Sequence, residues 1–245
     1  MEALAEIRTV FRLVQDEEGL WRVAQIRTAP DRWEDIELIA RALNSPNSQT
    51  VPSQCTVPDP PSKGSSGIQP TVKRARCVLG SLLGIEVPSD AIRIQEVSPL
   101  VIPTATEPSA VVVAWLRVEA RLENGKKGWQ VTELRTGKND WARLATVIAA
   151  MDELKRQRAQ TELGLIAVAL KSFRQDRGSF VVSDSQAVVI DYLNPHYLPR
   201  IIRVDPWHKP YKYLGESNRF ILRSDGPDGK ENTPDDILVS EASPR

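Results

Sequence analysis

Two stretches of the sequence repeat one pattern, "GLWRVAQIRTAPDRWEDI" at residues 19–36 and "KGWQVTELRTGKNDWARL" at residues 127–144. Both follow the scheme Trp-x-Val-x-x-(Ile/Leu)-Arg-Thr-x-x-x-x-Trp, with Trp21 and Trp129 in the first position. Shared spacing over this length indicates an internal repeat of one supersecondary unit. The tryptophans are expected to supply buried area within each unit. The repeated arginines, Arg27 and Arg135, are expected to cover a sheet edge, or alternatively to face a ligand.

An alternating stretch precedes each copy, namely "EIRTVFRLVQDEEG" at residues 6–19 and "VVVAWLRVEARLENG" at residues 111–125. Apolar residues at every second position around a short polar turn predict a β-hairpin. Apolar residues at helical spacing follow, and Trp33 and Trp141 are expected to enter these helices. The helical positions are Ile36, Ile39 and Leu43 in the first copy and Leu144, Ile148 and Met151 in the second. The sequence therefore predicts an α+β fold with duplicated hairpin–helix modules.

The second copy has further elements ahead of its hairpin. The segment "TVKRARCVLGSLLG" at residues 71–84 predicts a helix, and "DAIRIQEVSPLVI" at residues 90–102 predicts a strand pair or a bent strand. The first copy has no such elements, and a sheet without a covering helix exposes an apolar face. Two hypotheses follow: either the natural protein is longer at its N-terminus, or the first hairpin docks on the second module.

The remaining sequence divides at a proline-rich stretch and at a long helix. Residues 46–71 hold several prolines and the run "KGSSG", which disfavour helix and central strand and predict a linker. A helix is expected over about 140–177, capped by Asn139 or Asp140 and ended by Gly178, with two apolar stretches that pack on different partners. The expected organisation is a first module at 1–45, the linker at 46–71, a second module at 72–150 and a C-terminal domain at 151–245 that shares the helix.

The composition indicates a globular protein without whole-molecule charge. Lys+Arg and Asp+Glu both number 32, which gives a formal net charge of +0. A balanced chain has no general attraction to nucleic acid or to anionic lipid, so neither is expected as a partner. No apolar stretch is long enough for a membrane span, and the first residues lack the pattern of a signal peptide.

The cysteines and histidines give no catalytic or zinc motif. Cys55 and Cys77 fit no zinc spacing, and two hypotheses stay open: one disulfide in an exported chain, or two thiols. His196 and His208 flank Pro195 and Trp207 in turn-rich segments, without a recognisable nucleophile motif. The sequence therefore predicts a protein that is not an enzyme.

The stretch "RSDGPDGKENTPDDI" at residues 223–237 gathers four aspartates, at positions 225, 228, 235 and 236. Close carboxylates repel each other, and at about 5 Å in an effective dielectric near 20 a pair costs on the order of 3 kcal/mol. Gly226, Pro227 and Gly229 allow tight turns that direct backbone carbonyls inward. From these residues alone, a solvated turn is the simpler interpretation, and a bound hard cation is the alternative.

Four blocks, "LKSFRQDRGSF", "YLPR", "DPWHKPYKYL" and "RFILRSDGPDGKENTPDDI", resemble the C-terminal part of the major pseudopilin of type II secretion systems. The likeness covers about residues 161–240, and its most specific part is the pair Asp-Pro-Trp-x-x-Pro-Tyr and Ser-x-Gly-x-Asp-Gly. The resemblance implies a small antiparallel sheet and a loop that binds one Ca²⁺. It assigns side-chain ligands to Asp228, Asp235 and Asp236, and mainly backbone carbonyls to Asp225 and Lys230.

The same resemblance implies a function. Fibre growth in that family needs a hydrophobic N-terminal helix and a processing site, which this sequence lacks. We therefore expect a borrowed pseudopilin-like domain in a non-enzymatic, calcium-binding structural or interaction protein of the cell envelope. Its partners would be proteins of a secretion system or of the envelope, and its compartment periplasmic or extracytoplasmic if an export signal lies upstream. The alternative is a ligand- or protein-binding module whose repeat units form the cleft, with the pseudopilin-like domain as scaffold.

Overall fold

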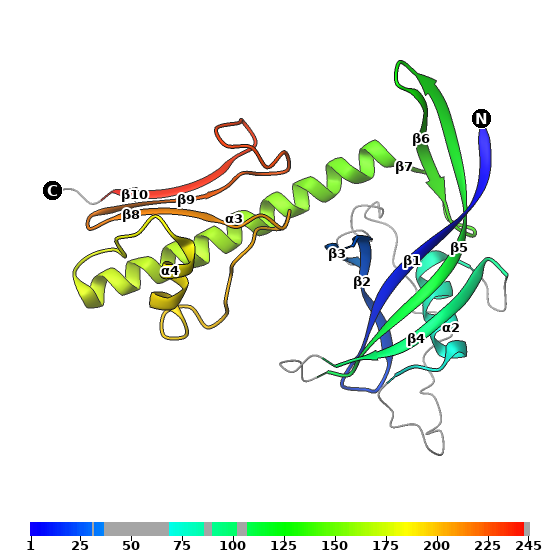
Figure 1. The fold of residues 1–245 in the computed structure, drawn as a ribbon, viewed down its shortest axis with the longest axis horizontal. Helices are drawn as coiled ribbons and strands as arrows, with labels where there is room; N and C mark the ends of the chain where they lie inside the picture. Colours follow the sequence, from blue (N-terminus) through cyan, green and yellow to red (C-terminus); the bar gives the residue numbers. More distant parts are fainter. Residues whose placement is uncertain (31, 37–68, 86–89, 102–106, 243–245) are drawn as a thin grey trace. The chain divides into compact units, whose positions relative to one another are not determined.

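The structure, a computed structural model, describes residues 1–30, 32–36, 69–85, 90–101 and 107–242 (Figure 1). Contacts divide the chain into two compact units, Met1–Met151 and Asp152–Arg245. Each unit combines helical residues with an antiparallel sheet, so the predicted α+β class is confirmed. Most of the predicted linker, and nearly all of the helix predicted after the first hairpin, lie outside the described residues.

The described part of the first unit is built on one seven-stranded sheet with the order β3-β2-β1-β5-β6-β7, in which β4 also pairs with β5. The strands are β1 (Glu2–Gln15), β2 (Trp21–Ala29), β3 (Arg32–Asp35), β4 (Ile92–Leu100), β5 (Ser109–Gly125), β6 (Gly128–Arg135) and β7 (Ala142–Arg143). β1 and β5 pair antiparallel from Glu2 opposite Arg121 to Val14 opposite Ser109. Both predicted hairpins therefore contribute to a single sheet, as in the hypothesis that the first docks on the second.

The two hairpins pair in corresponding registers. The pairs are Leu13↔Val23 and Gln25↔Asp35 in the first hairpin, and Leu122↔Val131 and Glu133↔Arg143 in the second. Each hairpin also shifts register at a β-bulge directly after an arginine, Arg12 in β1 and Arg121 in β5. The shared sequence pattern thus corresponds to a shared strand geometry.

The prediction that Trp33 and Trp141 enter helices is wrong. Trp33 lies in β3, which pairs with β2, and Trp141 directly precedes β7, which pairs with β6. Because a short third strand follows each hairpin, the long helix α3 begins only at Leu144. The guanidinium groups of Arg121 and Arg135 lie over the Trp141 ring, 4.1 Å and 4.7 Å from its centroid, so cation–π contacts hold this ring.

Asn139 was predicted to cap the long helix, but it bonds to the end of α2 (Val72–Leu83) instead. Its Nδ2 donates to the carbonyl oxygen of Leu83 at 3.0 Å, and Thr136 Oγ1 donates to the same oxygen at 2.9 Å. At the other end of α2, the hydroxyl of Thr71 accepts a backbone N–H at 3.1 Å. Both ends of α2 therefore have partners for groups that a helix leaves free.

Helix α2 packs on one face of the sheet, where it contacts β2 and β4. The core below it contains fully or almost fully buried residues from the helix and four strands, including Leu79, Phe11, Leu13, Ile92 and Val112. β4 is one strand with a register shift between Ile94 and Glu96, which fits the predicted bent strand. Cys77, in α2, is disulfide-bonded, and Cys55 lies outside the described residues.

The second unit contains α3 (Leu144–Arg177), in which the division between the units falls, and α4 (Gln186–Leu193). α3 is continuous for 34 residues, or about 50 Å, and Gly178 ends it with a φ of +82°. Ile148, near its start, is 57% exposed, so the predicted packing of the first apolar stretch on a partner is wrong for this residue. In the part of the chain that the structure describes, no helix has the length and hydropathy of a membrane span.

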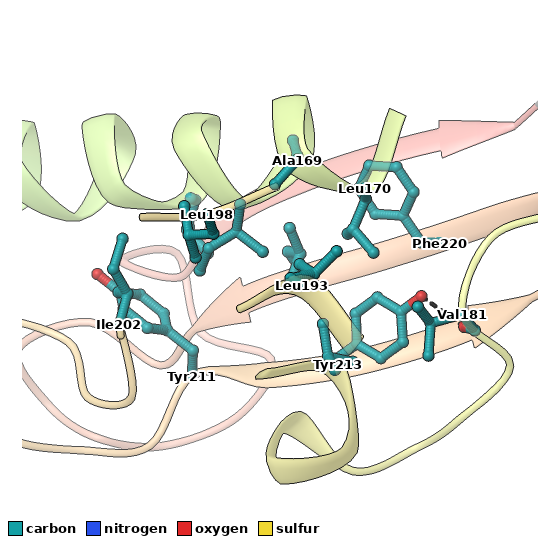
Figure 2. Close-up of a cluster of buried hydrophobic side chains, with 14 of the residues drawn as sticks. Ala169, Leu170, Val181, Leu193, Leu198, Ile202, Tyr211, Tyr213 and Phe220 are labelled. Carbon is teal, nitrogen blue, oxygen red and sulfur yellow. Dashed lines mark hydrogen bonds between the residues drawn. The ribbon is translucent and has the colours of Figure 1, made fainter. Parts of the chain in front are cut away.

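The second sheet consists of β8 (Lys212–Glu216), β9 (Arg219–Ser224) and β10 (Ile237–Ala242), in the order β10-β9-β8. Buried residues of α3 recur at helical spacing and form one core with the sheet, α4 and the segment after it. Figure 2 shows part of this core, with Ala169 and Leu170 from α3, Leu193, Leu198 and Ile202 from the intervening segment, and Tyr211, Tyr213 and Phe220 from the sheet region.

Two buried tyrosines of this core have hydrogen-bond partners. The hydroxyl of Tyr213 donates to the carbonyl oxygen of Val181 at 2.6 Å (Figure 2), and burial raises the pKa of Tyr213 to about 12. The hydroxyl of Tyr211 donates to Glu162 Oε2 at 2.7 Å, while Arg158 Nε donates to Glu162 Oε1 at 3.0 Å. Burial, and then the bond to Glu162, raises the pKa of Tyr211.

Leu170→Ala should lower the free energy of unfolding of the second unit by about 2–5 kcal/mol, because Leu170 is fully buried and its loss leaves a cavity. Leu165→Ala is the matched control, since Leu165 lies on the same helix and is 42% exposed. Urea titration followed by circular dichroism measures both variants. Equal destabilisation by the two substitutions would contradict the packing of α3.

Candidate metal site

The two most specific blocks of the C-terminal sequence meet at a buried carboxylate. Asp205 is 2% exposed, and its Oδ1 accepts the backbone N–H groups of Trp207 and Lys209 at 3.0 Å and 2.9 Å. Its Oδ2 accepts the hydroxyl of Ser224 at 2.5 Å. Ser224 Oγ in turn accepts the N–H of Gly226 at 3.2 Å. Asp205 therefore fixes both its own turn and the start of the aspartate loop.

Trp207 lies away from Phe173, near the start of the helical segment in this unit. Its indole N–H donates to Asp152 Oδ1 at 2.9 Å, more than five turns of α3 before Phe173. The rings of Tyr192 and Tyr197 contact Phe173 edge-on, with centroid distances of 5.8 Å and 5.5 Å. Trp207 thus joins the Asp205 turn to the beginning of the helical segment in this unit.

Asp225, the first residue of the loop, is held by cations of the sheet. Its carboxylate lies 2.8 Å from Lys212 Nζ and 3.0 Å from Arg223 Nε, and the residue is 6% exposed. Both cations also pair with Glu231, on the far side of the loop. Asp225, and after it Glu231, raises the pKa of Lys212. The Asp225 side chain is therefore committed to these ion pairs, while its backbone carbonyl is not part of them.

Three oxygen atoms of the predicted ligand residues converge on the hydroxyl of Thr233. Thr233 Oγ1 lies 3.1 Å from the carbonyl oxygen of Lys230, 3.1 Å from Asp236 Oδ1 and 3.4 Å from Asp228 Oδ1. A hydroxyl group has one proton to donate, so one hydrogen bond cannot satisfy all three acceptors. The loop therefore brings together more acceptor oxygen atoms than this hydroxyl can serve as a hydrogen-bond donor.

The other loop contacts close the turn around this point. Asp235 Oδ2 accepts the N–H of Asp228 at 3.2 Å, and Asp236 Oδ2 accepts the N–H of Asn232 at 2.9 Å. Gly226 has a φ of +63°, and a Cβ there would lie 2.4 Å from the carbonyl oxygen of Asp235. The two ends of the loop therefore approach so closely that only glycine fits at position 226.

All five predicted ligand residues, Asp225, Asp228, Lys230, Asp235 and Asp236, lie in the loop between β9 and β10. Within the described ranges, no group of three or more His, Cys, Asp or Glu side chains is close enough to hold a metal ion. The convergence at Thr233 joins two carboxylates to a carbonyl and a hydroxyl, which are oxygen types that Ca²⁺ accepts. These donors suit a hard cation.

The sequence analysis missed Thr233 in this arrangement. Threonine supplies a neutral oxygen, and its position directly before Pro234 and the Asp235–Asp236 pair was the signal that pointed to it. Ca²⁺ commonly accepts neutral oxygens beside carboxylates, so an acid-only search overlooks such residues.

The histidines lie outside the loop, and both are exposed. His208 occupies a turn with a φ of +67°, where its N–H donates to the carbonyl oxygen of Asp205 at 2.9 Å. His196 lines a cavity of about 750 Å³ together with Asp176, Asp191 and Ser179. Among the described contacts, no hydrogen bond joins His196 to these three side chains.

Asp205→Ala should destabilise the second unit by roughly 2–4 kcal/mol, because it leaves two backbone N–H groups and a buried hydroxyl without their acceptor. Asp184→Ala, at an exposed position, is the control for losing one aspartate charge. Urea unfolding measures both. A change in Asp205→Ala no larger than in the control would contradict the central role of this carboxylate.

Acid should weaken the loop partly through Asp235. The Thr233 hydroxyl, and then the N–H of Asp228, lower the pKa of Asp235, so the folded state favours its charged form. The resulting stabilisation is present above the ordinary aspartate pKa of about 3.9 and is lost as the pH falls through the lower folded value. Melting temperatures of the wild type and of Asp235→Asn between pH 6 and pH 3 test this. The wild type should lose more stability than the variant over that range, and parallel curves would contradict the assignment.

Comparison with known proteins identifies the C-terminal part of the chain. Residues 146–240 match the family described as Type II secretion system (T2SS), protein G. No curated protein and no solved structure matches the chain. The matched residues include nearly all of α3, strands β8 and β9, most of β10 and the aspartate loop. The C-terminal unit is therefore similar to type II secretion system protein G over these residues.

Proposed function

We propose that this chain is a non-enzymatic structural protein associated with secretion, which acts through contacts with other proteins. The observation that carries this proposal is the family match, because it covers the core, the buried Asp205 turn and the loop of the second unit together. Members of this family serve in assemblies with other secretion components, so protein partners are the natural binding class.

The second part of the proposal is that one Ca²⁺ completes the aspartate loop. Asp228 and Asp236 would give carboxylate oxygens and Lys230 its carbonyl oxygen, since all three already approach Thr233. Asp235 would add its carboxylate and Asp225 its backbone carbonyl. A cation there offsets the repulsion between the carboxylates and ties the start of β10 to the end of β9.

We place the protein outside the cytoplasm. Cys77 is disulfide-bonded, and disulfides persist mainly in oxidising compartments such as the periplasm. The disulfide and the family match both support a site of action at the cell envelope.

We further infer that the first unit contains a duplicated hairpin module. Besides the common register, the arginine that precedes the β-bulge makes an equivalent side-chain hydrogen bond in each hairpin. Arg12 Nη1 donates to Gln25 Oε1 at 3.1 Å, and Arg121 Nη1 donates to Glu133 Oε2 at 2.8 Å. The alternative function, a ligand cleft around the repeated arginines, gains no support from Arg135, which pairs with Glu119 and lies over a tryptophan ring.

Calcium should stabilise the second unit. With a Kd of about 10 µM, about 1 mM Ca²⁺ adds roughly 2.7 kcal/mol by mass action. Thermal melting in calcium and in chelator measures the effect, and limited proteolysis should cut the loop sooner in chelator. Asp228→Ala should remove most of the response, because it deletes one proposed ligand.

Asp184→Ala is the matched control, since it removes the same charge outside the loop and should keep the calcium response. Mg²⁺ at the same concentration controls for general screening. If calcium leaves the melting temperature and the proteolysis pattern unchanged, the loop is a solvated turn and the calcium part of the proposal fails. The secretion-associated role would then rest on the family match alone.

A further inference from the structure

The two hairpins of the first unit are related by an approximate half-turn. The bulges make Leu13 the counterpart of Leu122, and counting back along both strands makes Ile7 the counterpart of Leu116. Ile7 and Leu116 also lie directly opposite each other in the β1–β5 pair. A rotation by half a turn about an axis through this pair, perpendicular to the sheet, therefore exchanges the hairpins.

Under this half-turn, β4 has no described counterpart in the sheet. β4 pairs with β5 from Ser109 to Leu116, and the corresponding edge of β1 runs from Met1 to Ile7. Within the ranges that the structure describes, no strand pairs with that edge. Figure 1 shows β4 beside β5, and the N-terminal end of β1 at the margin of the sheet.

The backbone of β1 presents free hydrogen-bonding groups at this edge. Met1 and Leu122 exchange both hydrogen bonds, with the Met1 amino group to Leu122 O at 2.9 Å and Leu122 N to Met1 O at 2.8 Å. Bonding alternates along an antiparallel pair, so Ala3, Ala5 and Ile7 also bond towards β5. The N–H and C=O groups of the intervening residues, Glu2, Leu4 and Glu6, then point to the open edge.

The side chains near this edge are exposed where their counterparts are covered. Ile7 is 43% exposed, whereas Leu116 is 5% exposed beside β4. On β6, Val131 is 41% and Trp129 57% exposed, whereas Val23, the counterpart of Val131 on β2, is 9% exposed where α2 contacts that strand. The difference follows from α2 and β4, which cover one half of the symmetric face and have no described equivalent on the other.

We propose that the open edge of β1, together with Ile7, Trp129 and Val131, binds a helix–strand segment of a partner protein by strand addition. The strand lies antiparallel to β1 and receives hydrogen bonds from Leu4 and Glu6, as in other cases of β-augmentation. The helix covers Trp129 and Val131, in the position that α2 occupies over β2. This partner site lies wholly within the first unit, so it is independent of the calcium loop.

The half-turn also specifies the chemistry of the partner strand. In the β4–β5 pair, Ile92 lies opposite Leu116 and Arg93 opposite Trp115, whose counterparts on β1 are Ile7 and Glu6. A bound strand in the same register therefore places an apolar residue opposite Ile7 and a basic residue opposite Glu6. Glu6 already accepts arginine, since Arg93 Nη2 lies 3.4 Å from its Oε2. The fitting partner carries alternating apolar residues with a basic residue between them.

Amide hydrogen exchange on the full chain tests whether the edge is open. The amides of Leu4 and Glu6 should exchange rapidly, and those of Ala5 and Ile7 slowly, because only the latter pair bonds to β5. The probe for binding is a synthetic peptide of residues 69–101 with Cys77→Ser, which supplies the sequences of α2 and β4. Adding it should protect Leu4 and Glu6 and shift the indole resonance of Trp129.

Two variants at one position separate backbone addition from general adhesion. Leu4→Pro removes the N–H that faces the open edge without removing a bond to β5, and should weaken peptide binding at least about tenfold. Leu4→Ala keeps that N–H and should bind within roughly threefold of the wild type. Circular dichroism melting confirms that both variants are folded.

Several outcomes would overturn the proposal. Protected Leu4 and Glu6 amides in the free monomer would mean that the chain itself covers the edge. A dimer whose dissociation exposes these amides would assign the edge to a second copy of this chain. A peptide that fails to bind, or that binds Leu4→Pro as well as the wild type, would exclude strand addition at this site.

Discussion

The pairing of β1 with β5 is the interaction on which the first unit depends. It joins two hairpins that lie far apart in the sequence, and its register places Ile7 opposite Leu116 at the centre of the approximate half-turn. A one-residue slip would turn Phe11 and Leu13 from the core face to the opposite face, so the buried residues under α2 allow a single register. The positions of β4, of α2 and of the open edge all follow from this one pairing.

The second unit depends on a different constraint: the buried carboxylate of Asp205 needs hydrogen-bond donors. Asp205 receives hydrogen bonds from its own turn and from Ser224, and this links the segment before β8 to the end of β9. The long helix and the aromatic core supply most of the buried area, but they do not fix the loop. The loop is positioned at one end by Ser224, and at the other by the close approach of Gly226 to Asp235.

Much of this organisation was predictable from the sequence, and the limits have physical causes. Period-two patterning and turn residues predicted the hairpins, and the proline-free run predicted α3, because these signals are local. The third strands around Trp33 and Trp141 were missed, since a short strand is stabilised by its neighbour in the sheet rather than by its own pattern. Asn139 was misassigned for the same reason: its acceptor, Leu83, is distant in the sequence. In the loop, the acidic residues were evident, but the convergence on Thr233 is a property of the folded backbone.

The loop and the open edge of β1 both leave polar groups without a partner, but the cost to the stability of the folded chain differs between them. Backbone N–H and C=O groups at an exposed edge are hydrated, so an open edge costs little stability and mainly creates a risk of unwanted association. Charged residues such as Glu2 and Glu6 reduce that risk, because an added strand without a cation opposite them would remove water from their carboxylates without compensation. Clustered carboxylates, in contrast, repel one another whether or not a partner is present, and Lys212 and Arg223 offset this repulsion only around Asp225 and Glu231. A ligand of the loop would therefore change the stability of its own unit, whereas a ligand of the edge would mainly change what the protein associates with. The two proposed binding properties would thus stay separate, since calcium would act on the folded state of one unit and a partner strand on the surface of the other.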